Sequence, residues 1–412
     1  MRESENRLTQ FLEAIPVGVS VVDASGKPYY SNRAAIQLLG KEVIAEVTNE
    51  QIPEVYQMYQ AGIEREYPSA ELPTARALRG ESATADDMEI HQGDKIIPIE
   101  AWGTPIYDEK DNISYAIVAF QDITERKKAE TERIRFTNEL FQLNKAYERF
   151  VPNQFLQFLN KSSIIDVELG DQVQLEMSVL FSDIRDFTTL SESMNPEENF
   201  RFINSYLSRM EPVINENNGF IDKYIGDAIM ALFSGEADNA VKAGIAMLHR
   251  LGEYNQHRAH SGYAPIQIGI GINTGTLMLG TVGGQNRMEG TVISDAVNLA
   301  SRVEELTKNY GVSLLITDQT YSRLTNKNQY AIRTLDTVKV KGKSQAVAVM
   351  EVFDADPPAI KQGKLATLAL WQEALWLYNQ GNLADAGKLF ADCWRLNEGD
   401  RVARMYFNRC QQ

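Results

Sequence analysis

The chain has very little cysteine, with only Cys393 and Cys410 among its 412 residues. Two thiols near one end cannot form the disulfide framework of a small secreted domain, so a cytoplasmic protein is expected. No apolar run approaches the ~18 residues that a membrane-spanning helix needs. The polar residues 1–7 also lack the apolar segment of a signal peptide, and none is expected.

Excess positive charge is also missing. Lys and Arg number 41 against 56 Asp and Glu, which gives a formal net charge of −15. Such acidity argues against a nucleic-acid-binding protein and against binding to an anionic membrane surface. Most of the excess lies in residues 1–124, so the chain is expected to contain regions of different character. The 43% apolar content is globular, and the length predicts two or three domains.

Residues 1–124 alternate short apolar runs with turns, which predicts a mixed α/β domain. Five strands are expected, in an antiparallel sheet with helices between the second and third strands. The apolar runs are residues 14–22, 28–31, 88–90, 96–102 and 115–120.

This first region resembles a PAS sensor domain. The resemblance depends on the Ser31-Asn32 step after the second strand and on the closing Asp122-Ile123-Thr124-Glu125-Arg126. PAS domains often hold a small molecule, but no Cys is present for a flavin adduct. The single His91 is expected on a strand surface. The ligand is therefore unknown, and a role in dimerisation alone stays open.

Residues 125–150 predict a helix with an apolar seam. Phe136, Leu140, Leu143, Tyr147 and Phe150 follow one another at spacings of 4, 3, 4 and 3. This heptad spacing indicates a parallel coiled coil that transmits a signal. The alternative is a single amphipathic helix packed on a neighbouring domain.

Two aspartates are expected to converge in the region that follows. A buried strand over residues 177–182 ends at Asp183, and a β-hairpin of residues 219–233 carries Asp227 at its tip. An antiparallel sheet would bring these two ends together. Paired carboxylates suit hard divalent cations such as Mg²⁺ or Mn²⁺.

Residues 170–352 resemble a class III nucleotidyl cyclase catalytic domain, and from Arg149 onward the sequence looks most like cyanobacterial adenylate cyclases. Three motifs carry the resemblance, in the order and spacing of the family. They are Phe181-Ser182-Asp183-Ile184, Lys223-Tyr224-Ile225-Gly226-Asp227 and the stretch from Thr291 to Arg302, TVISDAVNLASR.

The resemblance implies a role for each matching residue. Asp183 and Asp227, with the Ile184 carbonyl, would bind two Mg²⁺ or Mn²⁺ ions. Lys223 and Thr291 would read the adenine of ATP. The remaining assignments place Asn298 on the ribose, Arg302 on the α-phosphate and Lys341 on the outer phosphates.

Two positions depart from the commonest pattern of the family. Thr291 stands where most adenylate cyclases have Asp, which places the chain in a Thr subgroup. The strand around Gly269 lacks an Arg that some relatives use for the phosphates. Arg185 or another cation is the candidate replacement.

The implied reaction is in-line attack of the ATP 3′-hydroxyl on the α-phosphate, which releases pyrophosphate and forms 3′,5′-cyclic AMP. The resemblance also implies a homodimer with active sites at its interface, because each site draws on both chains. The alternatives are a guanylate cyclase and a degenerate domain that only binds nucleotide.

The expected fold class is α+β multidomain, with a ferredoxin-like α/β cyclase domain. A linker is expected after the cyclase, followed by helices that resemble a tetratricopeptide hairpin. The predicted boundaries are 1–124 for the sensor, 125–150 for the signalling helix, 151–353 for the cyclase, 354–364 for the linker and 365–412 for the helical tail.

Overall fold

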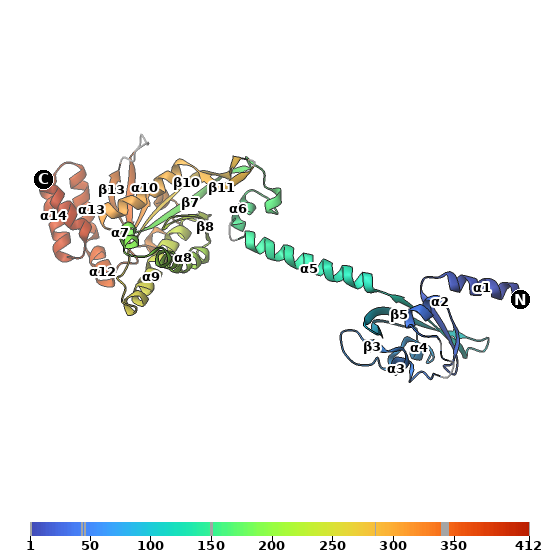
Figure 1. Cartoon of the computed structure of the whole chain (residues 1–412). Coiled ribbons are helices and arrows are strands. Elements are labelled where there is room, and N and C mark those ends of the chain that lie inside the picture. Colours follow the sequence, from blue (N-terminus) through green and yellow to red (C-terminus); the bar gives the residue numbers. More distant parts are fainter. Residues whose placement is uncertain are drawn as a thin grey trace. The chain divides into compact units, whose positions relative to one another are not determined.

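The computed structural model describes residues 2–42, 44, 47–148, 151–284, 286–338 and 346–411. The chain divides into two compact units, Met1–Lys145 and Ala146–Gln412, and each is described separately (Figure 1). In the described part of the chain, no helix is both long and apolar enough to cross a membrane.

The first unit is a six-stranded antiparallel sheet with short helices. Strands pair in the order β2-β1-β6-β5-β4-β3, so the five predicted strands are confirmed and a sixth, β3, is added. The sixth was missed because it has three residues, too few to set up an alternating pattern. The elements are α1 (Arg2–Ala14), β1 (Gly18–Asp23), β2 (Pro28–Ser31), α2 (Arg33–Leu39), α3 (Ile52–Tyr56), β3 (Met58–Gln60), α4 (Pro73–Ala77), β4 (Ala83–Gln92), β5 (Lys95–Tyr107) and β6 (Ile113–Asp122).

Asn32 explains the Ser31-Asn32 motif physically. Its side chain is fully buried and every polar atom has a partner. The Oδ1 atom accepts hydrogen bonds from the backbone N–H groups of Val19 and Ala35, each at 2.9 Å, and so caps α2. The Nδ2 atom donates to the carbonyls of Leu12 and Val17, also at 2.9 Å. One side chain thus joins α1, β1 and α2.

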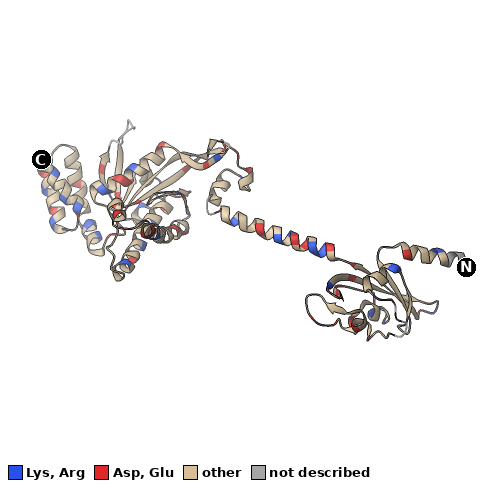
Figure 2. Cartoon of the chain, viewed as in Figure 1, with Lys and Arg blue, Asp and Glu red and all other residues tan. Residues whose placement is uncertain are grey.

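The closing motif of this unit starts helix α5 (Thr124–Tyr147). The Asp122 carboxylate accepts a 2.7 Å hydrogen bond from the Thr124 N–H, and Ile123 is buried. Arg126 pairs with Glu100 of β5 at 2.5 Å. No described side chain of α5 is buried, and charges of both signs follow one another along it (Figure 2). The predicted helix is confirmed, although the seam residue Phe150 lies outside the described residues.

The second unit is built on an eight-stranded sheet. Strands follow the order β13-β14-β12-β10-β7-β9-β8, and β11 pairs with β10 as a ribbon. The expected α+β class and the hairpin with Asp227 at its turn are confirmed. The elements before the tail are α6 (Asn153–Phe158), β7 (Gln172–Ile184), α7 (Phe187–Glu192), α8 (Pro196–Glu216), β8 (Gly219–Ile225), β9 (Ala228–Ser234), α9 (Ala237–His260), β10 (Ile268–Gly284), β11 (Arg287–Ile293), α10 (Asp295–Tyr310), β12 (Leu314–Thr317), α11 (Asp318–Ser322), β13 (Ile332–Val338) and β14 (Val347–Val352).

Helices cover both faces of this sheet. Helices α8 and α9 pack with Leu180, Ile229 and Ile270 in one buried cluster. On the other face, Phe181 and Met230 join Ala300 of α10 in a second buried cluster. Helix α10 approaches the sheet closely because a Cβ at position 271 would lie within 2.6 Å of backbone atoms of this helix. Gly271 therefore fixes the distance between α10 and the strands that carry the predicted site.

The predicted linker 354–364 is wrong over most of its length. Helix α12 (Pro358–Ala366) begins with Pro358 at its first position, where proline is well accommodated. Position 363 inside this helix is a glycine, and a Cβ there would meet the Asn397 side chain at 2.5 Å. The remaining elements are α13 (Leu368–Asn379), α14 (Leu383–Leu396) and α15 (Arg401–Cys410), which match the predicted tail helices.

Candidate active site

Asp183 and Asp227 lie side by side at one end of the sheet. Asp183 is near the end of β7, and Asp227 is in the tight β8–β9 turn, where Gly226 adopts a positive φ of 66°. The Ile184 N–H donates to both carboxylates, to Asp183 Oδ1 at 3.1 Å and to Asp227 Oδ2 at 3.3 Å. The two predicted metal ligands are therefore brought together, with Ile184 between them.

The proximity of the two carboxylates disfavours a second negative charge. Burial and a hydrogen bond with Asp183 raise the pKa of Asp227 to about 7. A divalent cation would relieve this repulsion, and hard carboxylate oxygens are the ligands that Mg²⁺ and Mn²⁺ prefer. Among the described residues no group of three His, Cys, Asp or Glu side chains could enclose a metal by itself. The pair fits cations that share their remaining coordination with substrate and water.

Lys223 and Thr291 meet although they are 68 positions apart. Lys223 is on β8 and Thr291 on β11, and the Lys223 ammonium donates to the Thr291 hydroxyl at 2.9 Å. The same ammonium lies 3.2 Å from Glu289 Oε1 and 3.5 Å from Asp222 Oδ2. The predicted base-reading pair thus forms one polar cluster, with a donor and a hydroxyl that can donate or accept.

Asn298 and Arg302 are one helical turn apart on α10. The Ser294 hydroxyl starts this helix by accepting from the Ala296 N–H at 2.9 Å, and it donates to the Thr276 carbonyl at 2.6 Å. Asn298 is exposed and Arg302 is half-buried. The last predicted substrate residue, Lys341, lies outside the described residues.

Two charged groups behind Asp183 were not predicted as a pair. Gly269 pairs with Asp183 across β10 and β7, and a Cβ at Gly269 would crowd the Glu304 carboxylate and lie 3.4 Å from the Arg185 guanidinium. Burial and the Asp183 charge raise the pKa of Glu304 to about 7. Arg185 donates to the Val312 carbonyl at 2.8 Å. The missing side chain at Gly269 was the one sequence signal for this cluster.

Glu289 was also missed. Its side chain is exposed apart from the Lys223 contact, and a glutamate in a polar strand gives no sequence signal of such a pairing. Its register on β11, two residues before Thr291, places it on the same face of the ribbon as the predicted base-reading residue.

A separate cavity of about 80 Å³ lies inside the first unit. Its described lining carries no charged side chain and is mostly aliphatic, with Met88, Ile99 and Phe120 among the buried residues. The hydroxyls of Ser20 and Ser31, 2.8 Å apart, belong to two of its few polar residues. His91 does not line it; this side chain stacks on Tyr59 and contacts Glu89.

The second unit thus combines paired carboxylates near the end of β7 and in the β8–β9 turn with a Lys–Thr pair that joins β8 and β11. Residues 171–352 match the family model described as adenylate and guanylate cyclase catalytic domain. Residues 6–123 match the PAS fold. The chain therefore carries a cyclase catalytic domain of this family, preceded by a PAS domain.

Two relatives agree in sequence with this assignment. An adenylate cyclase of Anabaena cylindrica is 46% identical over 221 residues, covering 52% of this chain and 44% of that protein. A terminal-differentiation-specific adenylate cyclase of Dictyostelium discoideum is 39% identical over 278 residues, covering 66% of this chain and 13% of that protein. The chain thus spans less than half the length of these two relatives. A crystal structure of an adenylyl cyclase from P. aeruginosa is 34% identical, with a TM-score of 0.41, and covers 44% of this chain and 96% of that one.

Proposed function

We propose that the chain is an adenylate cyclase that converts ATP to 3′,5′-cyclic AMP and pyrophosphate, with the PAS domain as its regulator. The contact between Lys223 and Thr291 carries the choice of base. Adenine offers an acceptor at N1 and a donor at its exocyclic amine, which match a lysine ammonium and a threonine hydroxyl. Guanine has the opposite polarity at these two positions.

In this proposal Asp183 and Asp227, with the Ile184 carbonyl, hold two Mg²⁺ or Mn²⁺ ions. The bound cations supply charge stabilisation and an activated 3′-oxygen. The protein's own contribution is to hold the two carboxylates close together, as their shared Ile184 N–H donor supports. Asn298 orients the ribose, and Arg302 stabilises the charge that develops on the α-phosphate.

Three further assignments are part of the proposal. Lys341 contacts the outer phosphates. Thr291 assigns the chain to the Thr subgroup of adenylate cyclases, and Arg185 is the cation nearest to Gly269, where some relatives place an arginine. The domain boundaries predicted above are retained, except that the linker is reduced to the residues before α12, and the tail is taken as a tetratricopeptide-like hairpin with one further helix.

We infer that the active unit is a homodimer. Large apolar side chains are exposed on β8 and on the β10–β11 ribbon, beside the Lys223–Thr291 contact: Tyr224, Ile225, Val282, Met288 and Ile293. Apolar side chains grouped around a polar site are typical of an interface. The exposed seam of α5, with Phe136 and Leu140, supports a parallel coiled coil in the same dimer.

The test is a turnover assay with purified protein, ATP and either Mg²⁺ or Mn²⁺. Cyclic AMP formation is expected, and Asp183→Asn should reduce it by at least ~100-fold. Lys223→Glu should lower the preference for ATP over GTP in a competition assay. Lys242→Glu is the matched charge reversal at an exposed position of α9, and it should leave this preference unchanged.

Three results would contradict the proposal. A higher turnover of GTP than of ATP would indicate a guanylate cyclase. Nucleotide binding without product, with both metals and over a range of protein concentrations, would indicate a degenerate domain. An unaltered ATP preference in Lys223→Glu would remove the assigned role of this lysine.

A further inference from the structure

The C-terminal helices share a buried core with the cyclase domain. Trp371 of α13, Phe390 of α14 and Tyr406 of α15 form an aromatic cluster, and the Trp371 and Tyr406 rings meet edge to face with centroids 5.5 Å apart. The same buried cluster contains Leu299 and Val303 of α10. Packing of the tail is therefore continuous with packing of the helix that carries Asn298 and Arg302.

The tail also supplies hydrogen bonds at an irregular point of the sheet. The pairing of β13 with β14 shifts register between Thr334 and Asp336, which leaves Leu335 as the extra residue of a bulge. The Trp371 indole N–H donates to the Thr334 carbonyl at 2.8 Å, and the Tyr406 hydroxyl donates to the Leu335 carbonyl at 2.8 Å. Two carbonyls at the bulge of this edge strand thus find donors in α13 and α15.

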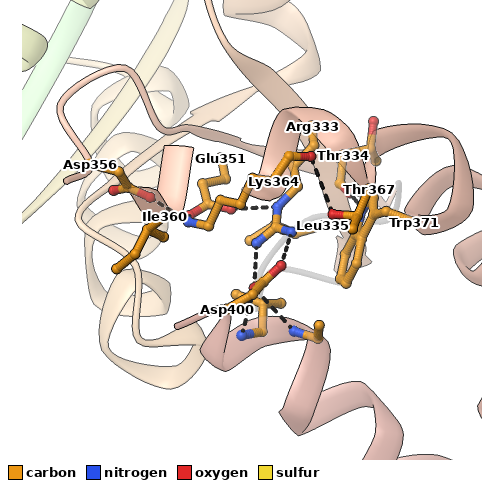
Figure 3. A network of polar contacts seen from close by, with 12 residues as sticks. Arg333, Thr334, Leu335, Glu351, Asp356, Ile360, Lys364, Thr367, Trp371 and Asp400 are labelled. Atoms are coloured by element: carbon orange, nitrogen blue, oxygen red, sulfur yellow. Dashed lines mark hydrogen bonds and ion pairs between the residues drawn. The ribbon is translucent and has the colours of Figure 1, made fainter. Parts of the chain in front are cut away.

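A buried network of charges joins the same elements (Figure 3). Arg333 of β13 contacts Glu351 of β14 at 2.6 Å and binds both oxygens of Asp400 at 2.5 and 2.9 Å. Lys364 of α12 bridges Glu351 and Asp356, each at 2.6 Å. The side chains of Arg333, Glu351 and Asp400 are at most 2% exposed. Separating α15 from the sheet would break the buried Arg333–Asp400 pair and leave Asp400 without its partner, so the two are held together.

Helix α10 is oriented by this shared core. Leu299 and Val303 are the next residues after Asn298 and Arg302, and both pairs repeat at a spacing of four. Consecutive helical residues differ by ~100° around the axis, so the buried pair sets the rotation at which the polar pair is presented. At the end of α10, the Tyr310 hydroxyl donates to the Asp336 carboxylate of β13 at 2.7 Å. The Arg409 guanidinium of α15 lies 5.9 Å from the centre of the Tyr310 ring.

We propose that helices α13–α15 are positioning elements of the cyclase site. Through Trp371, Tyr406 and the Arg333–Asp400 pair, they hold α10 at the rotation that directs Asn298 and Arg302 toward the substrate. The role assigned to these two residues rests on the proposed function. The orientation of α10 by the tail does not, and it can be measured without turnover.

The experiment uses Trp371→Phe and Tyr406→Phe in the full chain, with Trp376→Phe as control. Trp376 is on the same helix but is 62% exposed. Each test variant loses one hydrogen bond to the bulge and keeps an aromatic ring. Assays are run well below the melting temperature. We expect kcat to fall by about tenfold, short of the ~100-fold cost of a 1 Å misplacement, while KM for ATP and the ATP-to-GTP preference change less than twofold.

Amide hydrogen exchange over residues 295–303 gives the readout that does not depend on activity. Exchange is expected to be faster in Trp371→Phe and Tyr406→Phe than in wild type and Trp376→Phe. A lower melting temperature with unchanged kcat and unchanged exchange in α10 would reduce the tail to a stabilising role and overturn the proposal. If the wild-type chain makes no cyclic AMP, the proposed function fails, and the exchange measurement alone still decides whether the tail orients α10.

Discussion

Replacing Asp227 by Asn should stabilise the metal-free protein while removing the proposed cyclase activity. The wild-type carboxyl has a pKa of about 7 instead of 3.8 because it is partly buried beside Asp183. Above pH 7 the folded domain must hold two neighbouring negative charges, a cost that the neutral amide avoids. The two carboxylates that would bind a cation therefore destabilise the folded domain when no cation is bound.

The magnitude follows from the pKa. A rise of about three pH units corresponds to ~4 kcal/mol at ~1.4 kcal/mol per unit. Asp227 is only half-buried, and solvent screening reduces this to about 2 kcal/mol. For a domain of this size, 1 kcal/mol shifts the melting temperature by ~2–4 °C. Asp227→Asn should thus melt roughly 6 °C higher at pH 8 in the presence of EDTA.

The pH dependence gives the sign. Because the folded pKa lies above the unfolded value, the wild-type chain loses stability as the pH rises from about 4 through 7, and Asn does not titrate. The difference between the two proteins should therefore be complete above pH 7 and absent near pH 4. Added Mn²⁺ should raise the melting temperature of wild type more than that of Asp227→Asn. Calorimetric melts at several pH values, with Asp392→Asn of the exposed tail pair as control, test this. A variant that is less stable than wild type at pH 8 without metal would refute the reasoning.

Three other predictions concern buried positions. Gly271→Ala should lower the free energy of unfolding, measured by urea titration, by at least ~1–3 kcal/mol because its Cβ would meet the backbone of α10. The control Gly252→Ala has open space around its Cβ in α9 and should be neutral or stabilising. Asp238→Asn should lower the free energy of unfolding by about 1–3 kcal/mol at pH 7. Burial opposes the charge of the Asp238 carboxyl, but hydrogen bonds lower its pKa, so the stability difference between wild type and variant should shrink as the pH falls toward that pKa. With a thiol reagent at pH 8, Cys410 should react in the native chain and Cys393 only after unfolding, because burial raises the pKa of Cys393 to about 11.

The candidate site residues could be predicted from the sequence because they stand in regular, local patterns. Asp183 lies near the end of an apolar strand and Asp227 in a tight turn, so the antiparallel sheet brings them together. The spacing of Asn298 and Arg302 likewise places them on one helix face. Short sequence motifs are enough to predict these residues, and the structure adds the contacts between the motifs.

The Arg333–Asp400 pair and Glu304 follow no local sequence pattern. Arg333 and Asp400 are separated by 67 positions. From the sequence, each resembles a solvent-facing residue, Arg333 on a strand and Asp400 at a helix cap. Glu304 of α10 is partly buried beside Gly269, where a Cβ would crowd its carboxylate. Tertiary register decides these cases, and a single sequence contains no direct measure of register between distant segments.

The two halves of the site depend on different parts of the chain. The carboxylate pair is held by β7 and the β8–β9 turn, whose neighbouring side chains pack with α8, α9 and the inner face of α10. Asn298 and Arg302 instead follow the outer face of α10, which packs with β13, β14 and the tail. A change in the tail is therefore expected to act on the residues assigned to the ribose and the reacting phosphate, whereas the residues assigned to metal and base keep their own support. Effects on kcat and on nucleotide selection should separate along this division, with α10 as the element common to both cores.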